Sequence, residues 1–315
     1  MVHYILKRLG LLIIVVFGVT IATFVLMNMA PGDQAEMVAM ARYGLENLTA
    51  GEIENIRISE GLDAPVWVQY FHWLSHVSQG DFGYSLVTGG PVSQEIIARI
   101  PATLLLSITS LGFSLVIAIP AGVVSAVKHN SFVDHAARIG AMLGASIPNF
   151  WLALLLILLF SVTWGWFPVF GYGTASHIVL PAVTLGAGVA AITTRLIRAS
   201  MLEVLKQDYI FSARAHGISE KSVIFRHALK NAFIPVITVI GMQLGHLLEG
   251  TVIVESIFAW PGLGKLLVDS IYARDYAVIQ ACVLMFAVFF VLINLLVDLL
   301  YIILDPRIRY GRGAG

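Results

Sequence analysis

The feature that most constrains this chain is a stretch from Ile139 to Thr194 without a single Asp, Glu, Lys or Arg. A helix needs roughly 20 apolar residues to cross a bilayer core of about 30 Å, so this stretch is too long for one crossing and predicts two. Its middle, Trp164 to Gly173, is rich in aromatic residues, glycine and proline, which is typical of a turn at the membrane interface. The composition agrees, because 58% of the residues are hydrophobic and only 12% are charged.

Four further apolar segments are long enough to cross a membrane as helices. They are predicted at Leu9 to Met29, Ile100 to Val127, Ala232 to Val254 and Val278 to Ile303. The first segment is longer than the apolar core of a secretory signal, so we expect it to be retained as a helix. The sequence therefore predicts an all-α integral membrane protein with six transmembrane helices.

The charges are balanced in number but divided between the two sides of the predicted membrane protein. The 19 Lys and Arg residues equal the 19 Asp and Glu residues, so the chain lacks the basic surface of a nucleic-acid binder. With six spans, 14 of the 19 basic residues fall on the side of the two termini. Because basic loops stay in the cytoplasm, we expect cytoplasmic amino and carboxyl termini in a multi-pass protein.

Two polar segments outside the lipid are long enough to fold. Residues 1–29 would hold an amino-terminal segment and the first helix, and residues 30–99 are expected to form a small external cap with an amphipathic helix at Val66 to Val77. Residues 100–304 would hold the other five helices and a cytoplasmic loop at 198–230, and residues 305–315 a cytoplasmic tail. In that loop, Met201 to Ala215 predicts an amphipathic helix that Gly217 ends, and Ser219 can cap a second short helix. The pattern alone equally favours a hairpin lying on lipid headgroups.

A third polar segment contains Gly264-Lys265, which superficially suggests a phosphate-binding loop. Leu266 stands where that motif needs Ser or Thr, and no glycine occupies position 259. No nucleotide site is therefore expected in this chain.

The loop from Asp208 to Gly217 resembles the EAA motif of ABC importer permeases, and Arg226 to Pro235 resembles its continuation. The general motif has Glu-Ala-Ala, three residues and then Gly. Here only Ala213 and Gly217 match, a departure common in the dipeptide/oligopeptide/nickel branch. Further segments resemble that branch in chain order: Pro31-Gly32-Asp33, Gly80 to Ser85, Pro148 to Trp151, Phe258 to Gly262, Arg274-Asp275-Tyr276 and Asp305 to Arg309.

The resemblance implies an ABC type I importer permease in a bacterial or archaeal inner membrane. Such a chain is a non-catalytic half of a transmembrane heterodimer and needs no cofactor of its own. Its implied partners are a second homologous permease, two ATP-binding subunits that hold ATP and Mg²⁺, and an extracytoplasmic solute-binding protein. Short peptides are the expected cargo, with nickel, a metal chelate or glutathione as alternatives. The residues expected to couple to an ATPase are Ser212, Ala213, Arg214, Ala215, His216, Gly217 and Ile218.

Two other classes of protein remain as alternatives. A stand-alone secondary transporter usually shows internal repeats and a broken helix at mid-membrane, and no duplicated half is visible here. An intramembrane enzyme is disfavoured because the chain has neither an HExxH nor a GxSxG motif.

Ionisable residues inside predicted spans are candidates for a translocation path. Glu249 and Asp298 are the two acids so placed, and His246 and Met242 share one helix face with Glu249. Imidazole and thioether groups suit nickel-class metals, which makes His246 and Glu249 a weak metal candidate. The pattern favours the structural alternative, a hydrogen-bonded His246–Glu249 pair buried against a neighbour and an interhelical hydrogen bond for Asp298.

Histidines and methionines in the external part carry weaker signals. His72 and His76 lie four residues apart, a spacing that can hold a metal, but a third ligand is lacking and a solvated helix face is favoured. Four methionines gather near the end of the first helix, where apolar filling is favoured over a copper- or nickel-like relay. They are Met27, Met29, Met37 and Met40.

Overall fold

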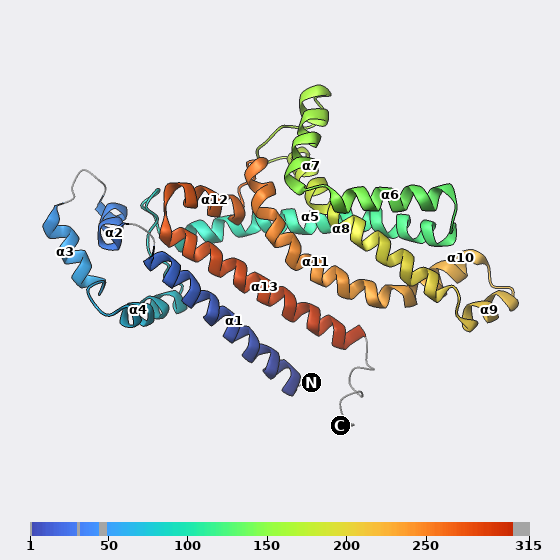
Figure 1. Cartoon of the computed structure of the whole chain (residues 1–315), viewed down its shortest axis with the longest axis horizontal. Helices are drawn as coiled ribbons and strands as arrows, with labels where there is room; N and C mark the ends of the chain where they lie inside the picture. Colours follow the sequence, from blue (N-terminus) through green and yellow to red (C-terminus); the bar gives the residue numbers. More distant parts are fainter. Residues whose placement is uncertain (1, 30–31, 44–48, 305–315) are drawn as a thin grey trace. The chain divides into compact units, whose positions relative to one another are not determined.

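The computed structural model describes residues 2–29, 32–43 and 49–304, and nearly all of them are helical (Figure 1). Within these residues the only extended pairing is an isolated antiparallel bridge between Tyr84 and Pro91. The chain divides into two compact units. The first comprises Met1–Thr103 and Pro261–Val291, and the second comprises Leu104–Trp260 and Leu292–Gly315.

Five helices are long and apolar enough to cross a membrane, and a bent helix pair makes a sixth candidate when it is counted as one span. The five are α1 (Val2–Asn28), α5 (Val92–Val127), α8 (Ala175–Val204), α11 (Leu229–Ile257) and α13 (Tyr276–Leu304). With the bent pair as one span the six-helix prediction is confirmed, and the five long helices all extend past their predicted bounds at one or both ends. α5 begins before Ile100 and α8 runs past Thr194, because flanking polar residues can continue a helix beyond the hydrocarbon region.

The bent pair is a feature that the sequence analysis did not predict. α6 (Phe132–Ser146) and the helix formed by α7 (Asn149–Leu156) and the π-helical η2 (Ile157–Thr163) meet at 107°. Pro148 lacks a backbone N–H and Ile147 before it is extended (ψ 123°), so the helix cannot continue through this point. The predicted non-helical turn does follow η2, and the next helix starts only at Ala175.

Three short helices follow α1 in the first unit (blue in Figure 1): α2 (Gln34–Tyr43), α3 (Ala50–Ser59) and α4 (Val66–Ser78). α3 begins with a capping box, in which Thr49 accepts from the Glu52 backbone N–H and Glu52 accepts from the Thr49 N–H at 2.8 Å. α2 and α3 pack through a small core that includes Ala35, Ala39 and Ile56.

The predicted amphipathic helix at Val66 to Val77 is confirmed as α4, and it packs on α1. Tyr70 is buried, its ring lies edge-on to Phe24 at 5.4 Å between centroids, and its hydroxyl lies 2.9 Å from the Thr20 hydroxyl. The segment expected to be a separate cap therefore shares a core with the first helix. α12 (Leu263–Ala273) also belongs to this unit, and it packs with the beginnings of α5 and α13.

The pair of Asp33 and Arg57 predicts a pH dependence for the α2–α3 packing. Burial by itself would raise the pKa of Asp33, but the Arg57 guanidinium and the Ala35 backbone N–H lower the pKa below its ordinary 3.8. A carboxylate with a lowered pKa stabilises the folded form above its unfolded pKa, and this contribution is lost as the pH falls through the folded value. Because both side chains are about a third exposed, we expect an effect of only about 0.5 kcal/mol.

Amide hydrogen exchange can measure this effect. Protection factors in α3, corrected for intrinsic exchange, should fall between pH 6 and pH 3, and the fall should be smaller in Arg57→Gln. Equal falls in the two proteins would contradict the assignment.

The second unit has a core that joins the ends of several spans to a short helix, α9 (Asp208–Ala215). Side chains of α5, α8, α9, η3 (Val223–Ala228) and α11 meet there. Its buried members are Ala118, Val123, Ala126, Ile197, Met201, Ile210, Ala213, Val223, Ala228, Ala232 and Val236. Because interiors are densely packed, a displacement of α9 is transmitted to the spans that share this core.

Candidate functional site

The predicted coupling loop is a helical hairpin rather than a long loop. The expected helix Met201 to Ala215 is wrong as a single element: Met201 is buried at the end of α8, and α9 starts only at Asp208. The chain turns between them through backbone hydrogen bonds from Lys206 to Glu203 and from Gln207 to Val204. The helical period continues in the sequence, but the direction of the chain changes, which a periodicity analysis does not detect.

Gly217 forms the corner of the hairpin, as predicted. Its φ is +76°, a left-handed conformation that glycine adopts without a Cβ penalty. The Gly217 N–H donates to the Arg214 carbonyl at 2.9 Å, and the Ile218 N–H donates to the Ala213 carbonyl at 3.2 Å. These two bonds make a Schellman ending for α9. A Cβ at Gly217 would meet no heavy atom within 4 Å, so the corner is open to solvent in this chain.

An ion pair closes the hairpin across the glycine. Arg214 Nε donates to Glu220 Oε1 at 2.7 Å, and Arg214 Nη2 donates to Glu220 Oε2 at 3.4 Å. The Asn231 amide also donates to the Tyr209 hydroxyl at 2.8 Å, which connects α9 with α11. The hairpin is therefore braced on both sides of its corner.

The second arm of the hairpin is the beginning of a span. Ser219 precedes α10 (Glu220–Ser222), as predicted, but its side chain makes no capping hydrogen bond. The expected second short helix is not separate, because α10 continues through η3 into α11. The continuous helical segment from Glu220 to Ile257 is a candidate span. A force on the hairpin would act directly on this helix.

The hairpin is partly buried, and several of its large apolar side chains are exposed. Six of the seven predicted coupling residues are exposed, whereas Ala213 is buried in the core of the second unit and anchors α9. Large apolar side chains that are exposed on the hairpin are Tyr209, Phe211, Ile218 and Phe225. Exposed large apolar groups beside charged residues are typical of a protein-binding surface.

Three of the four predicted path residues form an exposed stripe on α11. Met242 is exposed, and the side chains of His246 and Glu249 are 65% and 70% exposed, with His246 Nδ1 3.5 Å from Glu249 Oε2. The contact between the two side chains that the structural alternative expects is thus present, and no neighbouring helix buries the pair within the described part of this chain. The side chain of Asp298 lies outside the described residues. No group of three His, Cys, Asp or Glu residues able to hold a metal was found among the residues that the structure describes.

A buried ion pair was missed by the sequence analysis. Asp134 is fully buried, and Arg198 donates to both of its carboxylate oxygens, at 2.7 and 2.8 Å. Ser125 Oγ and the Asn130 N–H donate to the same carboxylate at 2.5 and 2.9 Å. The pair joins the α5–α6 turn to α8, close to the core that holds α9. The sequence analysis assigned both residues to cytoplasmic loops. The one signal in the sequence for a buried pair was an acid and an arginine that each lie beside an apolar run.

Family models match most of the chain. Residues 118–310 match the model for the binding-protein-dependent transport system inner membrane component, and residues 1–109 match the amino-terminal model of the same systems. The chain is 46% identical to the glutathione transport system permease protein GsiC of Escherichia coli (strain K12) over 310 residues. That alignment covers 98% of this chain and 100% of the relative. The GsiC protein of Shigella flexneri serotype 5b matches with the same identity and coverage.

Solved structures share the fold. The MetNI methionine ABC transporter in an inward-facing conformation aligns with a TM-score of 0.59 at 20% identity, covering 67% of this chain and 97% of the solved chain. An amino acid ABC transporter with histidines gives a TM-score of 0.52 at 16% identity, covering 73% and 97%.

Fold and family together define a membrane-spanning permease of ABC importers, which confirms the resemblance seen in the sequence. The chain belongs to the family of binding-protein-dependent transport system inner membrane components. It is a multi-pass permease of the inner membrane.

Proposed function

We propose that this chain is the non-catalytic half of a heterodimeric translocation path for short peptides, with glutathione-like tripeptides as the first candidates. The hairpin carries this proposal. Its exposed apolar side chains and braced glycine corner would enter a cleft in an ATP-binding subunit. Two such subunits would bind and hydrolyse ATP with Mg²⁺, and an extracytoplasmic binding protein would deliver the cargo. The similarity to GsiC, a glutathione permease by name, supports the choice of tripeptide.

The stripe on α11 supports a second permease subunit. An ionisable side chain exposed to hydrocarbon is costly, so Glu249 requires a water-filled path or a partner helix beside it. A homologous permease facing α11 would supply both the path and the partner helix.

The basic excess on the side of the termini supports a cytoplasmic hairpin, since positively charged loops stay in the cytoplasm.

Reconstitution tests the proposed function. The complete transporter in proteoliposomes, with its binding protein, should take up glutathione or trialanine when ATP is present, and the isolated chain should hydrolyse no ATP. Uptake of nickel ions but of neither peptide would favour the metal alternative. Uptake by the chain without ATP-binding subunits would contradict the importer proposal in favour of a secondary transporter.

The exposure of Glu249 leads to a labelling prediction. Glu249→Cys in the assembled transporter should react with a membrane-impermeant thiol reagent, because the side chain would face water in the path. Val116→Cys, at an exposed apolar position within α5, should stay unreactive, and the native Cys282 is fully buried. If the Glu249→Cys variant does not react either, the stripe is covered by protein or lipid.

A further inference from the structure

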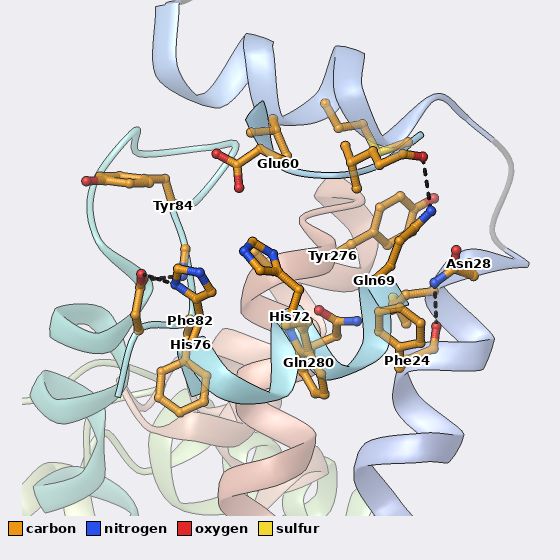
Figure 2. Close-up of a pocket in the computed structure, with 18 of the residues that line it drawn as sticks. Phe24, Asn28, Glu60, Gln69, His72, His76, Phe82, Tyr84, Tyr276 and Gln280 are labelled. Carbon is orange, nitrogen blue, oxygen red and sulfur yellow. Dashed lines mark hydrogen bonds and ion pairs between the residues drawn. The ribbon is translucent and has the colours of Figure 1, made fainter. Parts of the chain in front are cut away.

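The first unit contains a cavity of about 300 Å³ that the coupling mechanism does not use (Figure 2). Its walls come from the end of α1, from α2, from the residues directly after α3, from α4, from the segment after α4 and from the first two turns of α13. The cavity lies far along the chain from the hairpin and from the α11 stripe. All of its walls belong to the same compact unit.

The charged groups that line this cavity are acidic. Glu60 and Asp81 are among the lining residues, and no Lys or Arg lines the cavity in the described part of the chain. Figure 2 shows Glu60 reaching into the space that His72 and His76 face from α4. Asp81 is fixed in place, because its carboxylate lies 3.2 Å from His76 Nδ1 and accepts from the Gly83 N–H at 3.0 Å. The cavity therefore favours a cation.

Hydrogen bonds inside the unit make the lining richer in acceptors. The Gln69 amide nitrogen donates to the carbonyls of Leu62 and Ala64 at 3.0 and 2.8 Å. An amide nitrogen has two hydrogens, so both donors of Gln69 are used and its oxygen is the remaining group. A ligand that matches this lining must therefore supply hydrogen-bond donors.

Aromatic rings surround these acceptors. Five aromatic residues line the cavity, from α1, α4, α13 and the segment after α4. They are Phe24, Trp73, Phe82, Tyr84 and Tyr276. Ring faces attract cations through their quadrupole, and aromatic walls around acidic groups are a recurring way to hold an organic ammonium. The apolar remainder of the lining suits the carbon skeleton that carries the ammonium.

We propose that this cavity binds a primary ammonium group on a peptide chain. The proposal rests on the proposed function in one respect, the placement of the α2–α4 segment on the outer face. Two sources supply this chemistry there: the free amino terminus of a peptide cargo, and a lysine side chain of the extracytoplasmic binding protein. A metal ion is the poorer occupant, because the His72 and His76 rings meet edge to face at 4.7 Å between centroids and lack a third ligand among the described residues.

Calorimetric titration of the complete transporter, with the binding protein absent, tests the peptide source. The probes are trialanine and N-acetyl-trialanine, which differ in the ammonium group. Glu60→Gln should weaken trialanine binding by about tenfold and leave the weak binding of the acetylated peptide unchanged. Tyr84→Leu should also weaken trialanine binding through loss of a ring. Asp63→Asn, a nearby carboxylate outside the lining, is the matched control and should change nothing.

A second arm tests the lysine source. The binding protein is titrated into the same complexes before and after acetylation of its lysines with acetic anhydride, which removes their charge. If acetylation weakens binding of the binding protein and Glu60→Gln weakens it equally, the occupant is a lysine side chain. If Glu60→Gln weakens only the binding of trialanine, the occupant is the amino terminus of the peptide cargo. The proposal is overturned if Glu60→Gln behaves as Asp63→Asn in both arms. ATP-dependent uptake by the same preparations reports on the proposed function separately, so the two failures can be told apart.

Discussion

Replacing Gly217 with aspartate is expected to lower ATP-driven uptake by about tenfold or more while the transporter still assembles. A Cβ at this corner would meet no neighbouring atom, and aspartate is among the residues that tolerate a positive φ at moderate strain, so the fold of the hairpin should survive. The carboxylate would, however, add a charge to the exposed hairpin corner, next to Ile218 in the sequence, on the surface proposed to enter an ATP-binding subunit. A buried unpaired charge weakens such an interface strongly. ATP hydrolysis should continue without matching uptake.

Gly217→Asn is the matched control for this prediction. Asparagine has nearly the same shape as aspartate, tolerates a positive φ and carries no charge. We expect it to retain most of the uptake, which would assign the defect in Gly217→Asp to charge rather than to backbone strain. Uptake, ATP hydrolysis and subunit recovery should be measured on the same proteoliposomes. Normal uptake by Gly217→Asp would refute the coupling role of the hairpin.

The second large effect is expected at Asp134. Asp134→Asn removes the charge that Arg198 contacts through two hydrogen bonds, and it leaves a largely buried guanidinium without its counter-ion. Breaking a buried pair from one side costs about 3 kcal/mol, and the partial exposure of Arg198 argues against a larger value. The assembled transporter should therefore unfold at lower temperature, and its uptake should fall because α6 is no longer fixed to α8.

Two further variants distinguish the loss of this ion pair from a general loss of stability. Glu203→Gln removes an exposed carboxylate near the end of α8 and should change stability by less than about 0.5 kcal/mol. The double variant Asp134→Asn/Arg198→Gln should be more stable than the sum of the single effects predicts, because it leaves no unpaired charge. Additive single effects would show that the contact contributes little. Thermal unfolding of the purified complex measures all of these variants.

The sequence predicted the spans because their signal is local. About twenty apolar residues in a row are long enough to cross a bilayer as a helix whatever their neighbours are, and the predicted spans follow from this rule. The glycine corner was predictable for the same reason, since the conformation at Gly217 depends on one residue and on the end of one helix. The break before Pro148 could have been inferred from proline alone, but the apolar character of the stretch concealed it.

What the sequence by itself determined is the set of apolar segments long enough to span a membrane, the acids and bases within them, and the family motif between Asp208 and Gly217. The tertiary structure decided which of these residues meet. Asp134 and Arg198 pair across 64 positions of the chain, and the cavity of the first unit takes its walls from residues between Phe24 and Gln280. Helical periodicity describes the faces of one helix, whereas these contacts depend on how separate helices pack, and that packing is a property of the whole fold.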